Sequence, residues 1–148
     1  MKWFFEKSSV DELSIIIKNQ EYTSEVVDLM AYLEAYAGSS NGIVSVKTFD
    51  DILILKIDDI IAAEVDGDYL TIHYHNRDIS TRQRLYQFKQ RLNHPDMVQV
   101  SKQSLINIQH LERMEASFSG NMTAFLTGGL TVTVSRRYLK GLEKRLGL

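Results

Sequence analysis

Short apolar segments separated by turn residues run through most of this chain, and they constrain its fold more than any other feature. Segments rich in Val, Ile, Leu and Thr and bounded by Gly, Asn, Asp or Ser are typical of β-strands. We expect strands over residues 44–46, 52–57, 60–65, 69–75, 97–100, 105–108, 111–118, 122–126 and 130–134. The pattern therefore predicts a mostly β (α+β) fold, with turns such as Asp66-Gly67 closing its hairpins.

Three short helices accompany the predicted strands, each after a Ser or Thr that can cap its first turn. We expect a helix over about 24–37 after Thr23 or Ser24, one after Ser80 or Thr81 with Leu85, Phe88 and Leu92 on one face and Pro95 at its end, and one from Ser135 to Leu146.

The residues before position 43 predict a separate unit. Trp3-Phe4-Phe5 and the run from Leu13 to Ile17 predict two further strands before the first helix, which ends in the run from Gly38 to Gly42. We therefore expect a small N-terminal β-β-α segment over 1–42 and one domain over 43–148. The segment could pair two protomers, dock another protein or cap the sheets of the domain.

Composition excludes several classes of protein. The chain has no cysteine in 148 residues, which excludes disulfide frameworks, thiol nucleophiles and thiolate metal sites. Hydrophobic residues make up 44% and charged residues 24%, as in ordinary folded domains. We find neither a signal peptide nor an apolar run long enough to cross a bilayer, and we expect a cytoplasmic protein.

Charge is unevenly distributed along the chain. Residues 1–75 contain 5 Lys and Arg against 14 Asp and Glu, whereas residues 76–148 contain 12 against 5. A basic excess of this size favours a nucleic-acid partner, because binding to phosphates releases condensed counterions. The C-terminal half therefore carries the candidate polyanion-binding face.

No set of residues predicts catalysis or metal binding. His73 and His75 would share one face of a strand, but no third ligand lies at a fixed spacing, so we expect a solvated polar face. Ser135 lacks the Gly-x-Ser-x-Gly context of a nucleophile and is expected to cap a helix. We expect no enzymatic activity, no metal, no cofactor and no small-molecule substrate.

Basic side chains in two places are more informative. Lys102 lies in a polar break between two apolar segments, so it should project from the end of a sheet. Arg136 and Arg137 begin the last helix, where the helix dipole disfavours cations unless an anion is nearby. Both places suit contacts with phosphate, or with guanine, the base that Arg most often binds specifically.

Three blocks of the sequence resemble the LytTR DNA-binding domain, in the same order: Asp58 to Ile72, Val98 to Ile108, and Val134 to Lys140. The resemblance covers residues 52–148. It implies an elongated stack of antiparallel sheets whose loops, rather than a recognition helix, enter successive major grooves of bent DNA.

The resemblance also implies which residues contact DNA. Carried over by position, these are Asp68, Tyr69, Ser101, Lys102, Gln103, Arg136, Arg137 and Lys140. Lys102 and Arg137 would be the principal recognition residues, with Arg136 and Lys140 on phosphates. The family often has His-Arg-Ser where this chain has Ser101-Lys102-Gln103, and we expect Lys, a point charge, to discriminate less between bases than Arg does.

The resemblance points to a stand-alone bacterial transcription regulator that binds double-stranded promoter DNA. The segment before the match is too short for the receiver domain common in this family, and we expect none. Proteins of this type can be restrained by a membrane protein, and the N-terminal segment could instead form a homodimer through Val26, Met30 and Leu33. The alternative hypothesis is a protein-interaction module without specific DNA binding.

Overall fold

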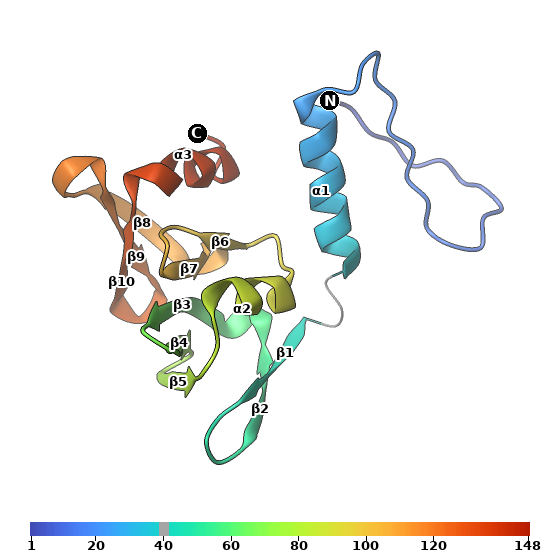
Figure 1. Cartoon of the computed structure of the whole chain (residues 1–148). Helices are drawn as coiled ribbons and strands as arrows, with labels where there is room; N and C mark the ends of the chain where they lie inside the picture. The colour runs from blue at the N-terminus through green and yellow to red at the C-terminus, as the bar shows by residue number, and fades with distance from the viewer. Residues whose placement is uncertain (39–41) are drawn as a thin grey trace.

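The computed structural model describes residues 1–38 and 42–148 (Figure 1). Its helices are α1 (Ser24–Gly38), α2 (Leu85–Leu92) and α3 (Arg136–Arg145). Its strands are β1 (Ile43–Lys47), β2 (Ile52–Lys56), β3 (Ile60–Asp66), β4 (Tyr69–Tyr74), β5 (Arg77–Thr81), β6 (Met97–Gln99), β7 (Ser104–Asn107), β8 (Leu111–Ala116), β9 (Met122–Leu126) and β10 (Leu130–Val134).

The strands form three sheets, and every strand pair is antiparallel. The largest sheet has the order β5-β4-β3-β7-β6, a second has the order β10-β9-β8, and β1 pairs with β2 alone. Gly67, with φ of 60°, makes the turn between β3 and β4 that the sequence predicts. The predicted mostly β fold of antiparallel sheets with short helices is confirmed.

Two clusters of buried side chains lie on opposite faces of β3. Ile60 and Ala63 enter the cluster that includes the apolar face of α2, while Ile61 and Ala62 enter the cluster of β9, β10 and α3. A bulge between Ile60 and Ala62 explains why two consecutive residues share a face, because it adds a residue and breaks the alternation of the strand. One strand thus supports both halves of the domain.

Helix α2 packs against the core through one face. Leu85, Phe88 and Leu92 are buried, as predicted, and each contributes about 1.5–3 kcal/mol by its removal from water. The predicted caps are wrong, because Ser80 and Thr81 belong to strand β5 and Arg84 stands at the N-cap. Thr81 pairs with Leu70 of β4, and its hydroxyl also donates to the carbonyl of Lys47 at 2.7 Å.

The N-terminal β-β-α segment is only partly as predicted. Helix α1 forms, but neither Trp3–Phe5 nor Leu13–Ile17 is a strand. No strand of the described residues pairs with these runs to complete a ladder of backbone hydrogen bonds, and their side chains are exposed, for example Phe5 at 89% and Ile16 at 79%. The predicted boundary at 42/43 follows residues 39–41, which lie outside the described residues.

Side chains of helix α1 contact side chains at the end of α3. Lys144 Nζ lies 2.8 Å from Asp28 Oδ2, and the Arg145 guanidinium lies 5.8 Å from the centre of the Tyr32 ring. Lys144 and Asp28 are largely exposed, so solvent weakens this ion pair.

Candidate nucleic-acid interface

The loop that carries Lys102 is fixed at its base and free at its tip. Val100 is fully buried, and its N–H donates to the carbonyl of Ser104 at 3.0 Å. Within the loop, the N–H of Gln103 donates to Ser101 Oγ at 3.2 Å. Lys102 is exposed and forms no ion pair in the part of the chain that the structure describes. Its charge is therefore available to an external anion, as predicted from the sequence.

Backbone hydrogen bonds join this loop to the other two predicted contact segments. The N–H of Val65, just before the β3–β4 turn, donates to the carbonyl of Gln103 at 2.8 Å. The N–H of Ser135, just before α3, donates to the carbonyl of Val100 at 2.8 Å. Segments far apart in the sequence thus meet at one edge of the domain.

The start of α3 concentrates positive charge. Arg136 and Arg137 are exposed, and the first turn contains no acidic residue. Ser135 occupies the N-cap position as predicted, but its side chain makes no capping hydrogen bond. The positive end of the helix dipole and two guanidinium groups therefore act together, an arrangement that favours a bound anion.

The turn between β8 and β9 also contacts Arg136. Its N–H donates to Asn121 Oδ1 at 3.0 Å. Gly120 has φ of +79°, and a Cβ built there would lie 2.9 Å from Cδ of Arg136. The positive φ favours glycine at this position, and the turn lies in contact with the side chain of Arg136.

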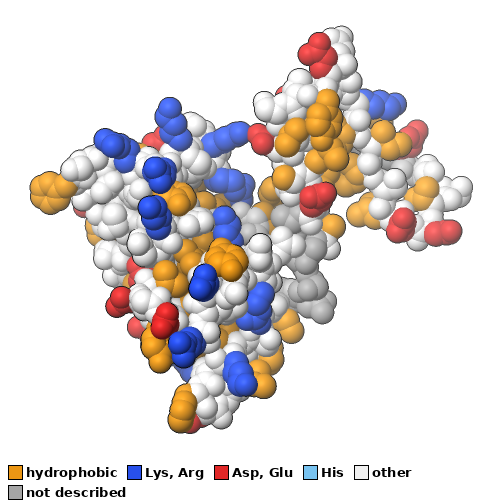
Figure 2. Space-filling view, viewed as in Figure 1, with side chains coloured by type: hydrophobic (Ala, Val, Ile, Leu, Met, Phe, Trp, Pro, Cys, Tyr) orange, Lys and Arg blue, Asp and Glu red, His pale blue; other side chains and the backbone are white. Residues whose placement is uncertain are grey.

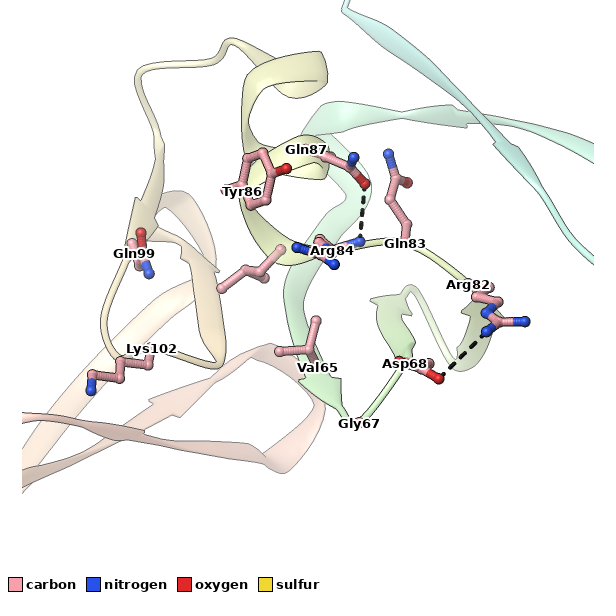
Figure 3. Close-up of a pocket in the computed structure, with 11 residues that line it drawn as sticks. Val65, Gly67, Asp68, Arg82, Gln83, Arg84, Tyr86, Gln87, Gln99 and Lys102 are labelled. Atoms are coloured by element: carbon pink, nitrogen blue, oxygen red, sulfur yellow. Dashed lines mark hydrogen bonds and ion pairs between the residues drawn. The ribbon is translucent and has the colours of Figure 1, made fainter.

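Two hollows open beside these segments. The first, of about 720 Å³, is lined by Asp68, Lys102 and the start of α2 (Figure 3). The second, of about 510 Å³, is lined by Arg137 and the end of α2. Gln99 lines both, so the two hollows adjoin. The other predicted contact residues lie outside them: Tyr69, Ser101, Gln103, Arg136 and Lys140.

Sequence reasoning missed the basic residues around α2. Arg82 and Arg84 line the first hollow, and Lys89 lines the second. Figure 2 shows Lys and Arg side chains gathered on the face that carries α2 and α3, with few acidic ones among them. The cluster Arg82-Gln83-Arg84 was the available signal, but nothing local places it opposite Lys102.

Asp68 is the one acidic residue predicted to contact DNA. Its carboxylate lies 3.5 Å from the Arg82 guanidinium, and both side chains are more than three-quarters exposed (Figure 3). Such a pair is weak and exchanges readily with solvent. The negative charge of Asp68 therefore neutralises the positive charge of Arg82 only in part.

The two histidines do not form the solvated face predicted for them. The His73 side chain is 15% exposed, with Nε2 at 2.9 Å from Glu64 and Nδ1 at 2.7 Å from Asp78. His75 has left the strand with φ of 51° and pairs with Asp59 at 3.1 Å. Within residues 1–38 and 42–148, no group of three or more His, Cys, Asp or Glu side chains could hold a metal ion.

None of the helices in the described ranges combines the length and apolar character needed to cross a bilayer.

Comparisons with known proteins agree with this architecture. The family model described as "LytTr DNA-binding domain" matches residues 50–147. A solved LytTr DNA-binding domain of a putative methyl-accepting/DNA response regulator from Bacillus cereus superposes with a TM-score of 0.66 at 16% identity, covering 74% of this chain and 100% of that one. At this identity the likeness shows the fold alone.

Curated relatives are regulators by name. The chain is 25% identical over 142 residues to "Sensory transduction protein LytR" of Streptococcus agalactiae, covering 96% of this chain and 57% of that protein. It is 27% identical over 103 residues to "Transcriptional regulatory protein LytR" of Staphylococcus aureus strain N315, covering 70% and 42% respectively. The chain thus spans about half the length of these relatives.

Proposed function

The chain belongs to the LytTR DNA-binding domain family, and from that premise we propose that it is a transcription regulator that binds double-stranded promoter DNA in a sequence-specific way. It acts by binding rather than catalysis, in the cytoplasm, where bacterial promoters lie. The main observation behind this proposal is that Lys102 and Arg137 are exposed cations on two different segments. The hydrogen bond from the Ser135 N–H to the Val100 carbonyl joins these two segments and so fixes their relative positions.

The proposed mode of binding uses loops. The Lys102 loop and the start of α3 enter the major groove, where base edges present a distinct pattern for each base pair. Arg137 suits guanine through its two-pronged guanidinium, while Lys102 contacts a phosphate or one guanine edge. Arg136 and Lys140 bind phosphates and so set the register of the protein on the duplex.

The N-terminal segment supplies a second, separate proposal: it pairs two protomers or docks a membrane-protein inhibitor. Among residues 1–34, 36 and 37 no side chain is fully buried; of the three residues expected to pair two protomers, Met30 is 40% exposed, and Val26 and Leu33 are half-buried. This exposure is what supports a partner. Sedimentation that finds only monomer at high concentration would rule out the homodimer.

The same exposure favours the rival function, a protein-interaction module. Trp3 and Phe4 are 83% and 84% exposed, and large exposed apolar groups usually mark a contact surface. Binding to DNA that does not respond to salt would favour this alternative over specific recognition.

The decisive experiment is selection of duplex DNA from a random pool by the purified protein at two salt concentrations. We expect enrichment of a short motif whose binding weakens steeply as salt rises, because phosphate contacts release counterions. A double variant, Lys102→Gln with Arg137→Gln, should lose the motif, whereas Lys47→Gln, outside both hollows, should retain it. No enrichment by the wild-type protein at low salt would overturn the proposal.

A further inference from the structure

Helix α2 presents an exposed ridge to both hollows. Its apolar side chains face the core, while Arg84 at its N-cap, Tyr86 and Lys89 are exposed. Arg84 and Tyr86 line the first hollow with Lys102 (Figure 3), and Lys89 lines the second with Arg137. We call Arg84, Tyr86 and Lys89 the α2 ridge. Each hollow is thus bounded by the α2 ridge on one side and a predicted DNA-contact residue on the other.

The two cations of the α2 ridge are unpaired, unlike their basic neighbours. Arg91 donates to the backbone carbonyl and Oγ of Ser45, and Arg145 donates to the carbonyl of Pro95 at 2.8 Å. Arg84 and Lys89 form no ion pair within the described residues. The neighbours hold the fold together, whereas the α2 ridge leaves two charges for a ligand.

We propose that the α2 ridge binds the phosphate backbone of the duplex whose bases the Lys102 loop and the start of α3 contact. The inference rests on the proposed function and adds a binding surface to it. Cations on the far wall of each hollow can hold the strand while the loops reach the bases, which matches the usual division between positioning and specifying contacts. Tyr86, 55% exposed, adds a hydroxyl donor to the first hollow beside Arg84.

Spacing along the helix suits this ligand. Arg84 and Lys89 lie five positions apart, a rise of roughly 7.5 Å at about 1.5 Å per residue. With about 3.6 residues per turn, their side chains also point roughly 140° apart around the helix axis, which agrees with the different hollows that they line. Each long, flexible side chain can therefore reach a phosphate on its own side of α2.

The test is a salt titration of the affinity for the selected motif and for a scrambled duplex. In Arg84→Gln with Lys89→Gln, the slope of log affinity against log salt should fall by about two, since each lost phosphate contact removes about 0.9. The ratio of affinities for the two duplexes should stay unchanged. Arg77→Gln with Lys47→Gln removes the same charges from exposed sites outside both hollows and should leave the slope nearly as in the wild type.

A conservative pair keeps the test independent of folding. Arg84→Lys with Lys89→Arg retains both charges and should retain the wild-type slope, because phosphate binding needs charge more than shape. If the Gln pair and the control pair share one slope, or if the Gln pair alters motif preference, the inference is overturned. If the wild-type protein itself selects no motif, the proposed function fails first, and the two failures are therefore distinguishable.

Discussion

The side-chain amide of Asn107 donates a hydrogen bond of 3.0 Å to the backbone carbonyl of Ile60, beside the bulge that interrupts strand β3. Asn107 is 1% exposed, and its Oδ1 accepts the N–H of Gln109 at 3.0 Å. Both ends of the amide are therefore used, and the end of β7 is fastened to β3.

Replacement of Asn107 by Ala should lower the free energy of unfolding by about 1–3 kcal/mol, because the Ile60 carbonyl is left buried without this donor. Urea denaturation measures the change. Asn76→Ala, in the exposed turn after β4, is the matched control and should change stability by less than about 0.5 kcal/mol. Equal effects of the two substitutions would contradict this role.

His73 should make stability depend on pH. Its hydrogen bond to Glu64, together with the bond and charge of Asp78, raises the pKa of His73 above its usual 6.5, and partial burial opposes this only in part. A raised folded-state pKa gives a stabilisation that is complete below the unfolded-state pKa and is lost as pH rises through the folded-state value. The difference in unfolding free energy between wild type and His73→Gln should therefore be largest below pH 6.5 and shrink as pH rises above it. If this difference stays constant with pH, His73 does not make stability depend on pH.

Arg137→Ala should cost roughly 1–3 kcal/mol of binding free energy for the selected DNA and relax preference at one base position. Arg137→Lys separates the two contributions of the side chain, since it keeps the charge but loses the planar fork. It should recover affinity better than preference. Unchanged affinity in Arg137→Ala would remove Arg137 from the interface.

Lys140→Ala should behave differently, because its proposed contact is a phosphate. Affinity should fall alike for all duplexes, and the salt slope should decrease by about one. Lys140→Arg should restore the slope. A loss confined to the selected motif would assign Lys140 to base recognition instead.

The sequence predicts most strands of the domain because their signals are local. Segments such as 122–126 and 130–134 alternate in burial and are bounded by glycine turns, and the structure places β9 and β10 there. Strand β5 was missed, since Ser80 and Thr81 suit a helix cap equally well, and the pairing with β4 and the contact with Lys47 that place them in a strand are tertiary. The two runs before α1 were predicted as strands but form none, because strand propensity alone does not make a strand without a partner strand.

The candidate interface was predictable in part. Lys102 follows from a polar break between apolar segments, and Arg136 and Arg137 follow from a helix start that disfavours cations. The two segments that carry these residues are joined by a backbone hydrogen bond from Ser135 to Val100. These residues lie 35 positions apart in the sequence, so no local pattern reveals the contact. The α2 ridge was missed for the same reason, since its partners across the hollows come from the Lys102 loop that follows β6 and from α3.

Strand β3, buried on both faces, has a consequence for the geometry of an operator. It belongs to both buried clusters, so the segments bearing Lys102 and Arg137 cannot shift independently without disturbing a shared core. A DNA-binding domain built in this way would be sensitive to the spacing between the two DNA sites that it contacts, as well as to their bases. One inserted base pair rotates the duplex by roughly 35°, since a turn takes about 10–10.5 base pairs. A rigid domain could not follow that change of phase, so the contacts proposed for one of the two segments would lose their alignment with the groove.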